Sequence, residues 1–187
     1  MKKSYISLIL IIVIISSIIF LLINNQNKKV NNQIKSNQGE TMKLTSNAFI
    51  NQGNIPTKYT CDGENINPPL QFSEIPKETK SLVLIVDDPD APVGDWVHWL
   101  VWNIDPNTTE LEENSLPGGS IQGITDFKEN KYGGPCPHSG THRYQFKLYA
   151  LDTTLDLSSD TTKKVLEQTI EAHIIDQTML EGVYKRI

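Results

Sequence analysis

The feature of this sequence that most limits its fold is residues 82–86, LVLIV, an apolar run without a polar residue. A short apolar run rich in β-branched residues is typical of a strand that is buried on both faces. Residues 97–104, VHWLVWNI, mix β-branched and aromatic residues before a turn signal, DPN. Residues 143–151, RYQFKLYAL, alternate between polar and apolar side chains, as a strand with one buried face does. The sequence therefore predicts a mainly β domain, with weaker strands at 43–49, 70–72 and 121–124.

One stretch has the periodicity of a helix. Residues 161–176 follow the capping residues 158–160, SSD, and place their apolar side chains on one stripe. This pattern predicts an amphipathic helix that lies on the sheet. Because His173 falls on the apolar side of the stripe, we expect a buried, hydrogen-bonded core histidine there.

The N-terminal part differs from the rest of the chain. Residues 4–23 carry no charge and include nine Ile, which is long enough to span a bilayer as a helix. We expect residues 1–23 to be a signal-anchor, and a cleaved signal peptide is the alternative. Residues 24–41, with nine Asn or Gln among eighteen residues, are expected to be a flexible linker. Residues 42–187 are then a membrane-tethered domain outside the cytoplasm, or a secreted one if the signal is cleaved.

The charge balance disfavours a nucleic-acid partner. The chain has a formal net charge of −5, and without the five Lys and one Glu of residues 1–40 the remainder carries −9. A protein that binds phosphate backbones needs a basic face, and an acidic domain does not supply one.

Three polar residues stand where a predicted strand meets a loop. Asp88 follows the first apolar run, and His98 and His142 begin the next two strands. By the two-residue period of a strand, each shares a face with apolar side chains of its own strand, which for His98 are Leu100, Trp102 and Ile104. If these strand ends meet at one sheet edge, they line a small pocket with an apolar floor, the usual form of a ligand site. Each residue alone could equally be a hydrogen-bonded structural residue.

Two blocks of the sequence resemble the signatures of the phosphatidylethanolamine-binding protein family. The first is DPDAP at 88–92 followed by WVHW at 96–99, and the second is GGP at 133–135 followed by GTHRY at 140–144. The similarity covers residues 43–187. The bacterial and archaeal branch labelled Raf kinase inhibitor-like is resembled in particular by YTCDG at 59–63, NPPL at 67–70 and GPCP at 134–137.

The resemblance implies a large antiparallel β-sheet packed on a smaller sheet with one or two peripheral helices. It also implies a pocket for phosphate-type anions such as phosphorylethanolamine head groups, either free or on a phospholipid, with no cofactor. The ligand-binding residues implied by motif match are Asp88, Pro92, Trp96, His98, Gly134, His142 and Tyr144. Arg143 is expected to point away into a structural pair. A protease or kinase is a further candidate partner, although the chain departs at its C-terminus from animal members, whose pocket an extra helix closes.

The residue types suit an anion. Two imidazoles can donate N–H bonds and become cationic near pH 6.5, their ordinary pKa. Exposed backbone N–H groups of the loop at Gly133 and Gly134 are expected to add donors. Asp88 is expected to orient a histidine.

The two cysteines, Cys61 and Cys136, lie in Pro/Gly-rich loops without C-x-x-C spacing, which disfavours a zinc knuckle. In a chain that enters the secretory route they are expected to form a disulfide, and two free thiols are the alternative.

Enzymatic functions are less expected than binding. A metal-dependent hydrolase could use His98, His142 and Asp88, since two histidines and a carboxylate can hold a metal ion. A thiol enzyme with Cys136 beside His138 or His142 is weaker, because a disulfide leaves no thiolate.

Overall fold

The structure, a computed structural model, describes residues 41–186. The signal-anchor predicted at 1–23 and the linker predicted at 24–41 lie outside these residues, apart from Thr41. Among the helices of the described part, none combines the length and the apolar character that a membrane crossing requires.

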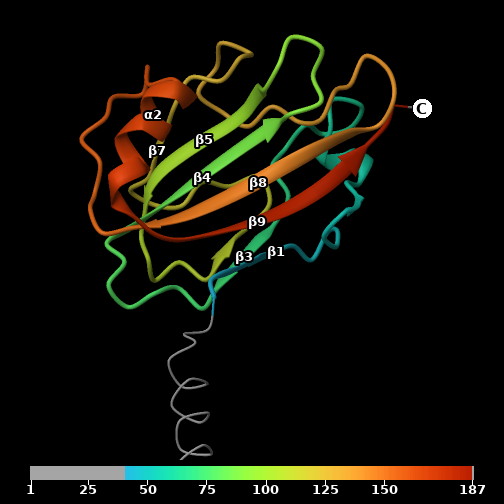
Figure 1. The fold of residues 1–187 in the computed structure, drawn as a ribbon. Coiled ribbons are helices and arrows are strands. Elements are labelled where there is room, and N and C mark those ends of the chain that lie inside the picture. The colour runs from blue at the N-terminus through green and yellow to red at the C-terminus, as the bar shows by residue number, and fades with distance from the viewer. Residues whose placement is uncertain (1–40, 187) are drawn as a thin grey trace, which may run out of the picture. The chain divides into compact units, whose positions relative to one another are not determined.

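The described residues form two β-sheets, as expected (Figure 1). The larger sheet has the strand order β2-β9-β8-β4-β5-β7, and the smaller sheet has the order β1-β3-β6. All neighbouring strands run antiparallel except the short β2, which lies parallel to β9. The strands are β1 Lys43–Thr45, β2 Gly53–Asn54, β3 Leu70–Ser73, β4 Ser81–Asp88, β5 Trp96–Ile104, β6 Glu110–Leu111, β7 Ile121–Gln122, β8 His142–Leu151 and β9 Ile174–Tyr184.

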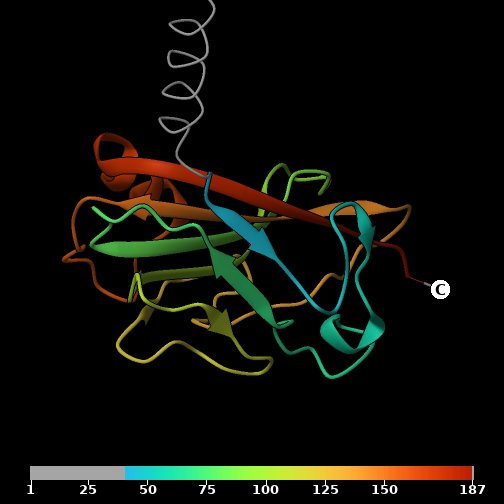
Figure 2. The ribbon, with the colours of Figure 1, turned by 90° about the horizontal axis from the view of Figure 1, so that it is seen from below.

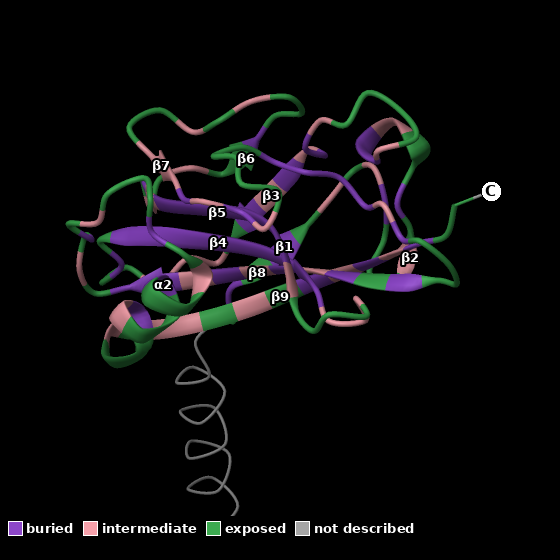
Figure 3. Ribbon diagram, turned by 90° about the horizontal axis from the view of Figure 1, so that it is seen from above, coloured by how far each residue is buried: buried purple, intermediate pink, exposed green. Residues whose placement is uncertain are grey.

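Apolar cores cover both faces of the large sheet. On one face the small sheet packs against it, seen in Figure 2, with Leu44 and Phe72 opposite Leu84 and Phe146. On the other face lies helix α2, Lys163–Ile170. All eight residues of β4 are buried, and Figure 3 shows β4 as a continuous buried strand. The prediction of a strand buried on both faces is therefore confirmed.

The predicted helix at 161–176 is too long. Helix α2 ends at Ile170, a 3-10 turn (η2) covers Glu171–His173, and β9 begins at Ile174. The residues from 174 onward pair with β8 along its whole length, and this long-range pairing outweighs their local helical pattern. The prediction of a buried His173 is also wrong. Its side chain is 42% exposed and pairs with Asp152 at the surface, 2.8 Å away.

Candidate functional site

A pocket of about 360 Å³ lies where the end of β4 and the starts of β5 and β8 meet. Five of the seven predicted ligand-binding residues line it, while Gly134 and Tyr144 do not. Residues that were not predicted as ligand-binding also line the pocket. The complete set is Asp88, Ala91, Pro92, Val93, Trp96, His98, Phe127, Cys136, Pro137, His138 and His142.

Asp88 and His142 form a buried dyad. The imidazole Nδ1 of His142 donates to Asp88 Oδ2 over 2.7 Å, and the side chains are only 11% and 5% exposed. The other carboxylate oxygen of Asp88 accepts the backbone N–H of Asp90, 2.8 Å away. Because both oxygens of Asp88 have a partner, the carboxylate orients His142 and leaves its Nε2 as the free ring nitrogen.

His98 is held in the same way by a backbone group. Its Nδ1 donates to the carbonyl oxygen of Gly133 at 2.5 Å, and Gly133 N–H donates back to the His98 carbonyl at 2.9 Å. Burial lowers the pKa of His98, although the Gly133 carbonyl and the charge of Asp88 act in the opposite direction. At neutral pH, His98 is therefore an uncharged imidazole whose free Nε2 accepts hydrogen bonds.

A β-bulge brings His98 to the pocket. Val86 pairs with Trp99, whereas Asp87 pairs with Val97, so His98 is an extra residue in β5. Beyond the bulge, Leu100 and Trp102 pack in the core under α2, on the opposite face of the sheet. The predicted face shared by His98 with Leu100 and Trp102 is therefore wrong. His98 lines the pocket because the bulge shifts by one residue the order in which β5 side chains point to the two sheet faces.

The backbone N–H groups that were predicted to face an anion already donate to other residues. Gly133 N–H bonds to His98, and Gly134 N–H donates to Asn65 Oδ1 over 2.7 Å. A Cβ at Gly134 would lie 2.5 Å from the carbonyl oxygen of Tyr59, so this glycine is required for close packing of two loops. The expectation that these N–H groups face an anion is wrong, because folding uses them to join the loops.

Tyr144 packs against a pocket residue but does not line the pocket itself. Its ring packs edge-on against His98 with the ring centroids 5.2 Å apart, and the residue is 1% exposed. Burial and the neighbouring Asp88 carboxylate raise the pKa of Tyr144. Its buried hydroxyl lies near Asp88 and the Cys136 backbone but makes no hydrogen bond of regular geometry within the described residues.

Arg143 pairs away from the pocket, as expected. Its Nε and Nη2 donate to the two carboxylate oxygens of Asp90 over 2.9 and 2.6 Å, and its backbone N–H also reaches Asp90. These bonds hold the pKa of Asp90 at about 2. Asp90 in turn donates its N–H to Asp88, so the pair anchors the loop that forms one pocket wall.

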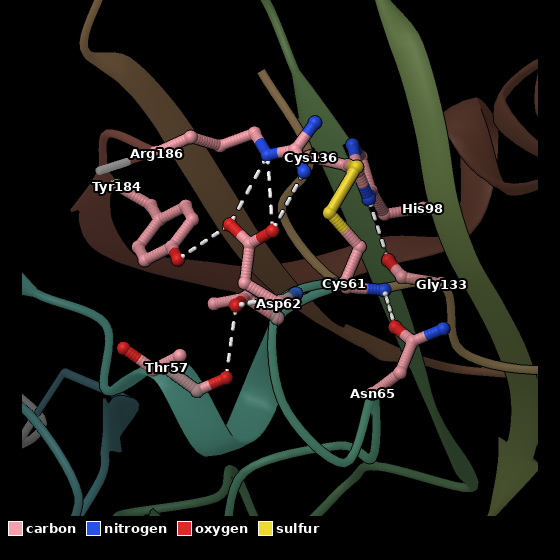
Figure 4. Close-up of a disulfide and its surroundings, with 11 residues drawn as sticks. Thr57, Cys61, Asp62, Asn65, His98, Gly133, Cys136, Tyr184 and Arg186 are labelled. Atoms are coloured by element: carbon pink, nitrogen blue, oxygen red, sulfur yellow. Dashed lines mark hydrogen bonds and ion pairs between the residues drawn. A yellow bond between two sulfur atoms is a disulfide. The ribbon is translucent and has the colours of Figure 1, made fainter. Parts of the chain in front are cut away.

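The structure joins Cys61 and Cys136 by a disulfide, with their Cα atoms 5.4 Å apart, so that Cys136 contributes to the pocket wall (Figure 4). The Cys61 loop has further attachments. Asp62 accepts hydrogen bonds from the Tyr184 hydroxyl and from Arg186, and Cys61 N–H donates to Pro135.

The residues proposed for a metal-dependent hydrolase do not converge as ligands. In residues 41–186 no three His, Cys, Asp or Glu side chains are grouped closely enough to hold a metal ion. Asp88 uses both oxygens within the protein. Within the described residues, Asp88, His98 and His142 therefore do not form a grouped set of metal ligands.

Known proteins resemble this chain along most of its length. The family model described as phosphatidylethanolamine-binding protein matches residues 45–185. A UPF0098 protein from Methanothermobacter thermautotrophicus is 51% identical over 150 residues, which cover 78% of this chain and 99% of that protein. A UPF0098 protein from Aquifex aeolicus is 43% identical and covers 84% of this chain and 96% of its own length.

Two solved structures also resemble the chain. The crystal structure of a putative phosphatidylethanolamine-binding protein homolog from Chlamydia trachomatis is 43% identical with a TM-score of 0.76, covering 79% of this chain and 99% of its own. E. coli YbcL, described as a new member of the mammalian family, is 32% identical with a TM-score of 0.75, covering 79% of this chain and all of its own. With the family model matching three quarters of the sequence, the chain belongs to the phosphatidylethanolamine-binding protein family.

Proposed function

We propose that the pocket binds a small phosphate-type anion between His98 and His142. The observation that carries this proposal is the pair of imidazoles whose Nδ1 atoms are bonded to Gly133 and Asp88. Neither Nε2 makes a hydrogen bond within the described residues, so both remain for a ligand in the pocket. Family membership and the motif match support the same assignment.

The binding is coupled to proton uptake. No Lys or Arg of the described residues lines the pocket, and the Gly133 and Gly134 N–H groups are already bonded. An imidazole that donates from Nδ1 donates from Nε2 only when it is protonated. An Nε2–H group that meets the anion therefore forms when an imidazole takes up a proton, and the resulting charge strengthens the bond.

The affinity for sulfate is expected to increase as the pH falls from about 8 toward 6, through the ordinary range of histidine. The pKa of His98 is lowered in the free protein, so its protonation still limits binding below about pH 6.5, and affinity keeps increasing there. Calorimetric titration with sulfate, which does not titrate in this range, measures the dependence on the full chain. An affinity independent of pH, or one that decreases on acidification, would contradict the proposal.

His142→Ala is expected to weaken sulfate binding about tenfold to a hundredfold, because it removes one charge-assisted hydrogen bond. His138→Ala is the matched control, since this exposed histidine lies on the rim of the same pocket without an internal partner in the described structure. Calorimetry on both variants, with a melting curve to confirm folding, makes the comparison. If His142→Ala binds sulfate as well as the wild type does, the assignment of the pocket is wrong.

A further inference from the structure

One side of the pocket is an apolar wall that the proposed anion site does not use. Val93 and Phe127 lie at the mouth, 79% and 39% exposed, and Trp96 is a further residue of the pocket lining. Ring centroids of Phe127 and Trp96 are 5.5 Å apart in an edge-on arrangement. Phe127 also packs edge-on against His98, at 5.3 Å. Phe127 thus connects the apolar wall directly to one anion-binding imidazole.

Long-range bonds position Phe127. The neighbouring Asp126 accepts Val97 N–H through its carboxylate at 2.8 Å and donates its own N–H to the Val97 carbonyl at 3.2 Å. The turn is closed by Thr125, which donates its N–H to the carbonyl of Glu129 at 3.0 Å. The turn is therefore joined to β5 one residue before His98.

The loop opposite leaves room for the ring. A Cβ at Gly133 would lie 2.4 Å from the Phe127 ring, so no larger residue fits there with the ring in place. Gly133 is the same residue that bonds to His98 through both its N–H and its carbonyl. The arrangement of His98 and that of Phe127 thus depend on one glycine.

The size of the pocket exceeds the need of an inorganic anion. A volume of about 360 Å³ lies at the lower end of the range of pockets for organic ligands. A tetrahedral anion held by two Nε2 atoms fills part of that space and leaves the aromatic wall without a contact. Apolar walls beside a few polar groups favour a ligand with both kinds of surface.

We propose that the ligand is a phosphate monoester with an apolar substituent, and that Phe127 determines the preference for that substituent. The inference rests on the proposed function, because the phosphate would bind His98 and His142. The substituent would pack on Phe127 and Trp96. Phosphate esters with a polar substituent, which include the free head groups of phospholipids, lack this contact.

The test compares three probes on the full chain by calorimetry at about pH 6.5, near the range where the phosphate and imidazole groups titrate. Methyl phosphate and phenyl phosphate differ in the size of the apolar substituent, and phosphorylethanolamine, a monoester with a polar substituent, represents a lipid head group. Phenyl phosphate is expected to bind about tenfold tighter than methyl phosphate, as an additional edge-on aromatic contact allows. It is also expected to bind tighter than phosphorylethanolamine.

Substitutions at Phe127 test whether this residue causes the preference for the apolar substituent. Phe127→Ala is expected to reduce the ratio of phenyl to methyl phosphate affinity to about twofold, and Phe127→Leu to an intermediate value, because leucine keeps apolar area but not the ring. Leu116→Ala is the matched control, since Leu116 is equally exposed, at 40%, and lies outside the pocket lining. The ratio should stay unchanged in that variant.

The outcomes separate the two proposals. If methyl phosphate binds and phenyl phosphate binds no tighter, only the apolar-substituent inference is overturned. The same holds if phosphorylethanolamine binds tightest, which would identify a lipid head group, or if Phe127→Ala keeps the full ratio. If neither methyl phosphate nor sulfate binds at any pH tested, the proposed function itself fails.

Discussion

Asp87→Ala is expected to lower the free energy of unfolding by about 3 kcal/mol, the low end of the range for breaking a buried ion pair. Asp87 is fully buried, and its Oδ2 accepts Lys147 Nζ at 2.8 Å and Lys163 Nζ at 2.5 Å. Burial alone would lower the pKa of Lys163, but its bonds to Asp87 and Asp95 outweigh burial and raise it. Without Asp87, both lysines lose a partner in a region of low solvent access.

Denaturant unfolding of the full chain measures this effect. Asp152→Ala is a suitable comparison, because its ion pair with His173 lies at the surface, with side chains 58% and 42% exposed. Surface pairs of this kind contribute about 0–1 kcal/mol. Equal, small effects for the two variants would show that the Asp87 cluster is not a major source of stability.

The second large effect concerns the disulfide. Replacing Cys61 and Cys136 together by Ser is expected to cost about 4 kcal/mol of unfolding free energy. The bond closes a loop with a sequence separation of 75, and in the chain-entropy model such a constraint mainly restricts the unfolded state. The local contacts of Asp62 with Tyr184 and Arg186 remain, so the folded loop should keep its position.

Unfolding curves with and without a reducing agent provide the control. Reduction should destabilise the wild type and leave the double Ser variant unaffected. Mass spectrometry of unreduced protein should find the pair two hydrogen atoms lighter than two thiols. Freely alkylated thiols in protein from its own compartment, or an unchanged unfolding curve after reduction, would contradict this prediction.

The ends of the strands show why part of the site could be predicted from sequence. Asp88 and His142 lie at strand ends, where the alternating side chains pass from the core to a loop. The regular pairing of β4 with β8 preserves this alternation. Period two also explains why Asp87 and Asp88 point to opposite faces, one toward α2 and one into the pocket. In a regular strand, the position of a residue in the sequence therefore determines the sheet face to which its side chain points.

Other parts of the structure differ from what their local sequence pattern predicts. His98 reaches the pocket only because of a bulge, which depends on how β4 and β5 pair. Residues 174–176 belong to the predicted helical stripe but begin β9, because pairing with β8 satisfies their backbone groups over a long distance. Neither the register shift nor the pairing partner has a signature within a single segment.

The mainly β class, the doubly buried strand, the residues of the dyad and the cysteines of the disulfide could be predicted from sequence patterns. These follow from short-range patterns of polarity and from residue types whose chemistry is specific. Which polar groups of the described residues remain without a partner depends on the tertiary structure. It engaged the N–H groups of Gly133 and Gly134, left Nε2 of two histidines without a partner in the described structure, and placed Phe127 beside them. The physical reason is that hydrogen-bond satisfaction and close packing depend on contacts between segments far apart in the chain.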